Sequence, residues 1–283
     1  MIDFPEPSGA SAKPRALLKR ARGPFTARLH VSKATAGTLL LGIIVGLSLG
    51  APYITPLDPL HAPTGAELLP PSWAHPLGTD LLGRDVWSRV LYGGRQTLLI
   101  ALLAVGIAVL PGAAIGVLAG VTTRQFDAVI GIFLNAVLAF PPLLLALMIK
   151  VIIGTGPLPI AVAVGGAGIA PVAQVMRRAA RSVLVQPYID AARSIGASPA
   201  RIVRRHVLPN VLLPLLGFTT VTLSWTILNA ATLYFLGLGG EGATPEWGSM
   251  LAQGRIAFAV APWAALAPGT AIMITLLAVN LLA

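Results

Sequence analysis

Long uncharged, apolar stretches alternate with short charged segments along this chain. All thirty Asp, Glu, Lys and Arg residues fall outside six windows of at least 22 residues each. The windows are 34–57, 96–123, 128–149, 151–176, 207–240 and 256–283. About 20 apolar residues are enough for a helix to cross a membrane. The pattern therefore predicts an all-α membrane protein with six transmembrane helices.

The composition supports this prediction. Only 11% of the 283 residues are charged, whereas 55% are hydrophobic. A soluble domain has about 25% charged residues, and uncharged apolar runs longer than about 18 residues are typical of membrane helices. A soluble helical core is the alternative, and this composition disfavours it because so few charges do not cover a water-facing surface.

The basic residues predict an orientation. If the amino end lies in the cytoplasm, fifteen of the twenty Lys and Arg residues fall in the inner segments, which are 1–33, the link at Arg124, and 177–206. This asymmetry agrees with the positive-inside rule, and six spans return the carboxyl end to the cytoplasm. Because the basic residues adjoin membrane helices, the net charge of +10 indicates membrane lipids or acidic protein partners, not nucleic acid.

These segments divide the chain into four parts. We expect a cytoplasmic arm at 1–33, a first transmembrane helix at 34–57, an external segment at 58–95, and a five-helix core at 96–283 that includes a cytoplasmic loop at 177–210. In the external segment, Thr79 or Asp80 is expected to cap a helix on the membrane surface. The apolar side of that helix is formed by Val86, Trp87, Val90 and Leu91.

Glycine and proline predict how the spans pack and bend. Two four-residue repeats place small residues on one helix face, which favours close helix packing in lipid; they are Gly42, Gly46 and Gly50, and Gly112, Gly116 and Gly120. The pair Pro141 and Pro142 removes backbone donors and predicts a bend or break in the third span.

The loop 177–210 has the pattern of two short helices protruding into the cytoplasm. The first is expected to end near Gly196, and the second to begin with Ser198 as its cap and Pro199 in its first turn. Pro209 is expected to close the second helix before the fifth span.

The residues before this turn predict a docking surface for another protein. Ala191 and Ala192 allow close approach, and Gly196 allows the left-handed backbone of a tight helix end. Asp190 and Arg193 offer charged contacts that fix register. The alternative interpretation is an ordinary basic loop beside the membrane.

This loop resembles that of the permease subunits of bacterial ABC importers. Their loop carries an acidic residue, two alanines, a glycine four positions on and a later Leu-Pro, which here are Asp190, Ala191, Ala192, Gly196 and Leu208-Pro209. The family usually has glutamate where this chain has Asp190. The segments 75–95, Ala139–Pro141 and Pro245–Gly248 are similar to the second permease subunit of the dipeptide, oligopeptide and nickel importer group.

The resemblance covers residues 34–280 and implies a fold, a function and partners. It implies the type I ABC importer permease fold with cytoplasmic coupling helices, and import of peptides or a similar small solute. It also implies a homologous permease subunit, two ATP-binding subunits that hold ATP and Mg, and an external solute-binding protein. The coupling residues would be Asp190, Ala191, Ala192, Arg193 and Gly196. At Ile132 and Asn135 the chain departs from the group, which often has Arg and Asp there.

The chain itself is not expected to be an enzyme. It contains no Gly-x-x-x-x-Gly-Lys-Ser/Thr phosphate loop, and its four histidines are scattered, so we predict no catalytic, cofactor or metal site in it. Asn135, Ser224 and Asn229 are candidates to line the pathway, with hydrogen bonds between helices as the alternative role. A self-sufficient secondary transporter or channel is the rival function, which the lack of charges inside the windows disfavours.

Overall fold

The computed structural model describes residues 24–240 and 244–282 of the chain. Within these ranges the regular elements are helices, and the only bridge is an isolated antiparallel one between Thr79 and Asp85. The helices are α1 (Pro24–Leu49), α2 (Ala51–Ile54), α3 (Val86–Val121), α4 (Arg124–Leu138), α5 (Pro142–Ile153), α6 (Pro157–Leu184), α7 (Pro187–Ser194), α8 (Pro199–Ile202), a π-helical turn (Val203–Val207), α9 (Leu208–Phe235), α10 (Trp247–Gly254), a 3₁₀ turn (Arg255–Ala257) and α11 (Trp263–Leu282).

Each of the six apolar windows corresponds to one helix or to one pair of helices. Four helices are long and apolar enough to cross a membrane: α3, α6, the continuous helix Pro199–Phe235 that ends in α9, and α11. The pair α4 and α5, bent by 90°, forms a fifth candidate, and α1 contributes the shorter apolar helix Lys33–Leu49. The predictions of an all-α membrane protein and of a break at Pro141-Pro142 are confirmed.

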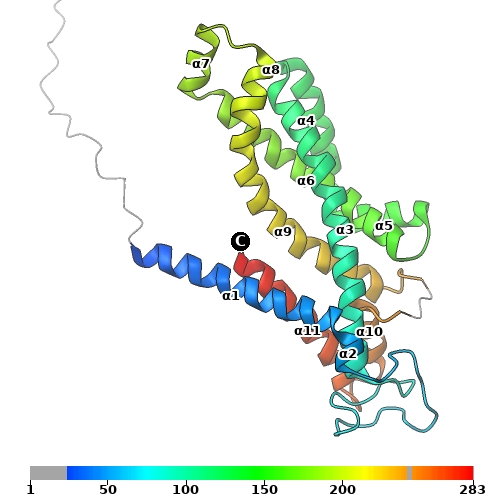
Figure 1. Ribbon diagram of the computed structural model, residues 1–283. Coiled ribbons are helices and arrows are strands. Elements are labelled where there is room, and N and C mark those ends of the chain that lie inside the picture. Colours follow the sequence, from blue (N-terminus) through cyan, green and yellow to red (C-terminus); the bar gives the residue numbers. More distant parts are fainter. Residues whose placement is uncertain (1–23, 241–243, 283) are drawn as a thin grey trace, which may run out of the picture.

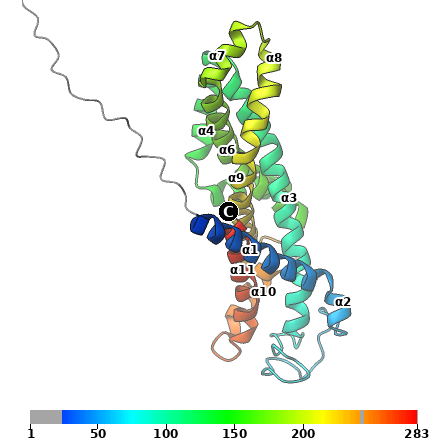
Figure 2. The same cartoon turned by 60° about the vertical axis from the view of Figure 1, so that its left-hand side comes forward.

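The helices place two groups of short elements at opposite ends of the molecule. Figures 1 and 2 show α7 and α8 at one end and α2 and α10 at the other, with α3, α6 and α9 running between them. Helix α1 lies beside α11, and α5 packs against α6. Residues 187–202 are thus separated from residues 58–85 by the length of the transmembrane helices.

The second glycine repeat forms the tightest helix contact, between α3 and α6. A Cβ atom added to Gly116 would lie 2.3 Å from the carbonyl oxygen of Ala173, and one added to Gly112 would lie 2.8 Å from Cβ of Val172. The packing prediction is therefore confirmed for this repeat. At Gly42 and Gly46, added Cβ atoms would meet nothing within 4 Å among the described residues, so the first repeat makes no close helix contact within this chain at these two positions.

The helix ends differ from the edges of the charge-free windows. Helix α5 continues through Lys150 to Ile153, and the chain turns at Gly154 and Gly156, whose φ angles are 107° and 121°. Helix α6 continues past Met176 to Leu184. The assumption that the spans carry no charge is thus wrong at Lys150, whose side chain is buried. Charged residues thus lie inside α5 and α6, so the edges of the charge-free windows do not mark the helix ends.

Two further expectations about local structure are corrected. The expected surface helix is the first part of α3, and its cap is Asp85, whose carboxylate accepts a hydrogen bond from the Ser88 amide at 2.7 Å. Pro209 does not close a helix either, because the chain remains helical from Pro199 to Phe235. Proline has no backbone N–H, so Pro209 cannot donate the hydrogen bond of a regular helix. The π turn at Val203–Val207, which precedes Pro209, has a different hydrogen-bond spacing and accommodates this missing bond.

Candidate functional site

Helix α7 projects from the end of the molecule with one buried face and one exposed face. Ile189 packs in the same apolar cluster as Ile202 and Val207, which fixes α7 to the helix that leads into α9. Asp190 and Ala191 are exposed, whereas Ala192 is buried. Of the two alanines expected to admit another protein, only Ala191 lies on the exposed face.

Gly196 forms the turn between α7 and α8. Its φ angle is 81°, its amide donates to the Arg193 carbonyl at 2.9 Å, and the Ala197 amide donates to the Ala192 carbonyl at 3.0 Å. These two bonds form the Schellman motif that ends a helix on a left-handed residue. Ser198 then caps α8 by accepting from the Arg201 amide at 3.4 Å. The predicted helix-turn-helix is confirmed.

The two charged residues of α7 contact each other on the exposed face. Nη1 of Arg193 donates to Oδ1 of Asp190 at 3.1 Å, and the two side chains are 54% and 73% exposed. An ion pair this exposed contributes little to folding. Both groups therefore remain accessible to a partner.

A ladder of polar side chains joins α4 to α6. Asn135 accepts from Gln174 at 3.2 Å, and Gln174 accepts from Arg177 at 3.3 Å. Arg177 donates to Asp127 at 2.5 Å, and Arg181 also pairs with Asp127. Asn135 therefore makes a hydrogen bond between helices. These ion pairs were not predictable from the sequence, because Asp127 lies 50 or more positions from the two arginines.

Ser224 and Asn229, the other pathway candidates, lie on α9. The Ser224 hydroxyl is buried and has no hydrogen-bond partner among the described residues. The Asn229 side chain donates to the Trp225 carbonyl of its own helix at 2.8 Å. Among the residues that the structure describes, no hydrogen bond joins Asn135, Ser224 and Asn229 to one another.

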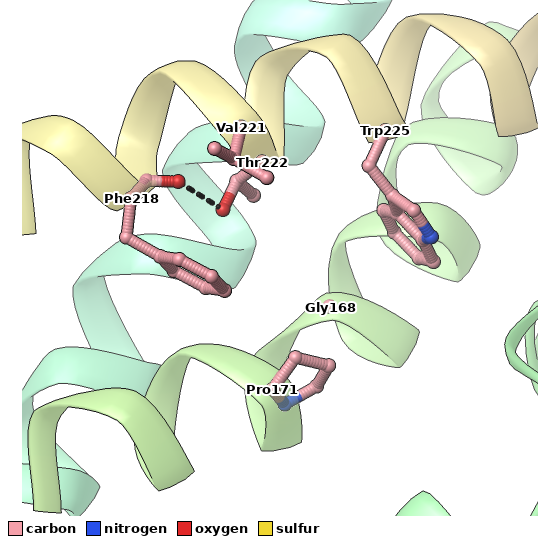
Figure 3. Close-up of a pocket in the computed structure, with 6 residues that line it drawn as sticks. All are labelled: Gly168, Pro171, Phe218, Val221, Thr222 and Trp225. Atoms are coloured by element: carbon pink, nitrogen blue, oxygen red, sulfur yellow. Dashed lines mark hydrogen bonds between the residues drawn. The ribbon is translucent and has the colours of Figure 1, made fainter. Parts of the chain in front are cut away.

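A small apolar cavity of about 100 Å³ lies where α9 crosses α6 (Figure 3). Trp225 and Phe218 of α9 face Gly168 and Pro171 of α6 across it. The Thr222 hydroxyl donates to the Phe218 carbonyl at 2.8 Å, so its polar group is satisfied within its own helix. Glycine and proline thus leave space beside α6 that aromatic side chains of α9 only partly fill.

The external segment is fixed to the helices by buried charges. Asp80 accepts from Nε of Arg84 at 2.8 Å and pairs with Arg89 at 3.4 Å. Both arginines also donate to Oε1 of Gln253 in α10, at 2.9 and 3.4 Å. Thr79 and Asp80, expected as helix caps, instead belong to this network, in which Thr79 accepts from the Trp263 indole through its carbonyl at 3.1 Å.

The segment Pro245–Gly248 fixes α10 between α3 and α9. The buried Glu246 accepts from the Thr97 hydroxyl at 3.0 Å and from the Ser249 amide at 2.9 Å. The Trp247 indole donates to the Val90 carbonyl at 2.8 Å. Burial raises the pKa of Glu246 to about 7, against the lowering effect of its hydrogen bonds. The sequence did not predict this buried carboxylate, because its partner Thr97 lies 149 positions away.

Comparison with known proteins identifies the family. Residues 112–283 match the model of the family described as the binding-protein-dependent transport system inner membrane component. The di/tripeptide transport system permease protein DppC of Pseudomonas aeruginosa is 38% identical over 259 residues, which cover 89% of this chain and 86% of that protein.

Other relatives have similar lengths and related names. A putative peptide transport system permease protein of Brucella suis is 40% identical over 87% of this chain and 83% of that protein. The glutathione transport system permease protein GsiD of Pectobacterium atrosepticum is 36% identical over 90% of this chain and 84% of that protein.

A solved structure shares the fold. A chain of the MetNI methionine ABC transporter in inward-facing conformations matches with a TM-score of 0.56 and 21% identity, covering 69% of this chain and 91% of that chain. The chain therefore belongs to the family of inner membrane components of binding-protein-dependent transport systems, and it has the fold of a type I ABC importer permease.

Proposed function

We propose that this chain is the permease subunit of an importer that moves di- or oligopeptides across the cytoplasmic membrane and is driven by separate ATP-hydrolysing subunits. The names of the relatives support peptides as the solute. The observation that carries the coupling proposal is the exposed face of α7, held at a fixed angle by the Gly196 turn. We assign Asp190, Ala191 and Arg193 to contact with an ATPase subunit, and Ala192 and Gly196 to the shape of the contact.

Three kinds of partner follow from this proposal. A homologous permease subunit completes the pathway, two ATP-binding subunits hold ATP and Mg, and an external binding protein delivers the peptide. The α7–α8 end faces the cytoplasm, and the α2–α10 end with its network around Asp80 faces the binding protein. The separation of these two ends in Figure 1 supports this arrangement.

Transport then couples the closure of the ATPase subunits to the change of the transmembrane helices between inward-facing and outward-facing states. Closure of the ATPase subunits displaces α7, and α6, which ends two residues before α7 begins, transmits the displacement to its contacts with α3. A self-sufficient transporter is less well supported, since Lys150 and the charges around Asp127 lie at helix ends or in ion pairs and form no chain through the spans.

The test is ATP hydrolysis by the chain purified with its partner subunits and binding protein in lipid nanodiscs. We expect dipeptides to stimulate hydrolysis and free amino acids not to do so. Asp190→Asn should lower both the stimulated rate and the recovery of the ATPase subunit. The difference from the unmodified chain should be largest at low salt, because screening weakens the exposed charged contact of Asp190 as salt rises. Asp190→Glu should retain both, since it keeps the charge.

Asp58→Asn provides the matched control. Asp58 is also an exposed aspartate, but it lies in the external segment, where it accepts from the Leu60 amide. This variant should behave like the unmodified chain. Lack of stimulation by any peptide would refute the assignment of peptides as the solute. Equal recovery of the ATPase subunit with the unmodified chain, Asp190→Asn and Asp190→Glu would refute the contact through α7.

A further inference from the structure

Three arginines form an open basic hollow just before α9. The side chains of Arg201, Arg204 and Arg205 border a space of about 560 Å³ together with Ala200. All three side chains are exposed. No ion pair among the described residues includes any of them, in contrast to Arg177, Arg181 and Arg193. The hollow therefore concentrates positive charge without a carboxylate to neutralise it.

An apolar groove of about 650 Å³ adjoins this hollow on the membrane side. Helices α3, α6 and α9 all contribute to it, and its lining is almost entirely apolar. It includes Val117, Met176, Leu208, Leu212 and Leu215. Leu208 and Leu212 are 42% and 55% exposed, so the groove is open along its length.

The hollow and the groove share one face of a single helix. Arg204 lies in the π turn of the continuous helix Pro199–Phe235, and Leu208 and Leu212 follow it at intervals of four residues. Four residues make about one turn of either an α- or a π-helix, so the three residues lie on the same side. Leu208 to Leu215 spans about 10 Å at 1.5 Å per residue, compared with about 15 Å for the hydrocarbon of one leaflet. The row thus changes from cationic to apolar over a length that matches a lipid headgroup and the upper part of its acyl chain.

We propose that this face binds one anionic phospholipid of the inner leaflet. Arg201, Arg204 and Arg205 hold its phosphate, and an acyl chain lies in the groove between α3 and α9. The guanidinium geometry suits phosphate oxygens, and basic pockets between helices on the cytoplasmic side are a general mode of headgroup binding. Free phosphate leaves the groove empty, and an acidic protein surface would neutralise the arginines without filling it. The assignment rests on the proposed orientation, in which this end is cytoplasmic.

Bound lipid can be measured without transport. The chain, purified with its partner subunits, is placed in nanodiscs of phosphatidylcholine with 20% or no phosphatidylglycerol, and the lipid retained after detergent extraction is counted by native mass spectrometry. We expect retention of phosphatidylglycerol by the unmodified chain. Its affinity should fall about fivefold for Arg204→Gln and further for Arg204→Gln with Arg205→Gln, since each basic residue near the surface contributes about 1 kcal/mol. The double variant Arg204→Lys with Arg205→Lys should retain much of the affinity for phosphatidylglycerol.

Two controls separate this site from general charge attraction. Arg178→Gln removes an equally exposed charge of α6 at the same end of the molecule and should leave retention unchanged. Leu212→Ser keeps every arginine and should still weaken retention, because it disrupts the acyl chain contact. Inorganic phosphate at millimolar concentration should not displace the lipid.

Each contrary result overturns the proposal in a recognisable way. Equal loss with Arg178→Gln would mean a diffuse charge effect, and no effect of Leu212→Ser or displacement by phosphate would mean that an anion alone is bound. Loss of the ATPase subunit from the arginine variants, with lipid retention unchanged, would assign the arginines to that partner. Because lipid is counted directly, a failure of peptide stimulation leaves this test intact.

Discussion

Gly196 shows how much of the site depends on one backbone conformation. An added Cβ atom would meet nothing within 4 Å, so space does not require glycine there. The φ angle of 81° requires glycine, because a left-handed backbone costs an L-residue about 1–2 kcal/mol. The sequence was sufficient to predict this turn, since the glycine, the Ser198 cap and Pro199 are neighbours in the chain.

Gly196→Ala should therefore reduce coupling while leaving the transmembrane helices in place. The strain lowers the ratio of native to non-native turn by a factor of about 5 to 30. We expect peptide-stimulated ATP hydrolysis to fall several-fold while the yield of membrane-inserted chain is unchanged. Gly217→Ala is the control, because Gly217 lies within α9 with equally open space, and alanine favours that helix. Full coupling in Gly196→Ala would contradict the role of the turn.

Glu246 makes stability depend on pH. Its pKa rises from 4.5 in water to about 7 in the folded chain because of burial. Below pH 4.5 both states carry the proton, whereas between 4.5 and 7 only the folded state keeps it, so this residue's contribution to stability decreases as the pH rises through that range. Thermal unfolding in detergent should show this decrease, and Glu246→Gln should reduce it.

Glu67→Gln is the matched control for this titration, because Glu67 is exposed in the external segment. It should leave the pH dependence as it is. A Glu246→Gln variant with the same pH dependence as the unmodified chain would refute the titration. The buried position of Glu246 was beyond sequence reasoning, because only the folded chain brings Thr97 to its carboxylate.

At the scale of elements, the contact between α3 and α6 organises the core. The spacing of Gly112, Gly116 and Gly120 predicted close packing on this face of α3 but not that α6 is the partner helix. At Gly42 and Gly46 the same spacing has no close neighbour among the described residues, because a smooth helix face does not specify which helix lies against it. The helix ends also differed from prediction, since Lys150 and Arg177 lie within helices that continue past the edges of the charge-free windows.

Gly116→Ala should destabilise the fold by about 1–3 kcal/mol. The new methyl group would lie 2.3 Å from the Ala173 carbonyl oxygen, which requires the two helices to separate. Gly106→Ala in the same helix meets nothing within 4 Å and should be neutral or slightly stabilising. Thermal unfolding in detergent compares the two variants. Similar melting temperatures would mean that α3 and α6 tolerate separation.

At the scale of the whole molecule, we propose that the two ends face opposite sides of the membrane, as the distribution of the basic residues predicts. The chain has no cysteine, so single cysteines can report on each end. Pro70→Cys should react with an impermeant thiol reagent in intact cells, and Ser198→Cys should react only after the membrane is opened. Both positions are exposed, so access depends on the side of the membrane. Labelling of Ser198→Cys in intact cells would contradict the proposed orientation.

The 90° bend between α4 and α5 has a consequence for how the chain is made. With 15 and 12 residues, neither helix reaches the length of about 20 residues that the bilayer requires of a single span. Both helices pack against α6, which is synthesised after them. During biogenesis, we therefore expect this part of the chain to remain near the insertion machinery until α6 emerges and the three helices to enter the membrane as one unit.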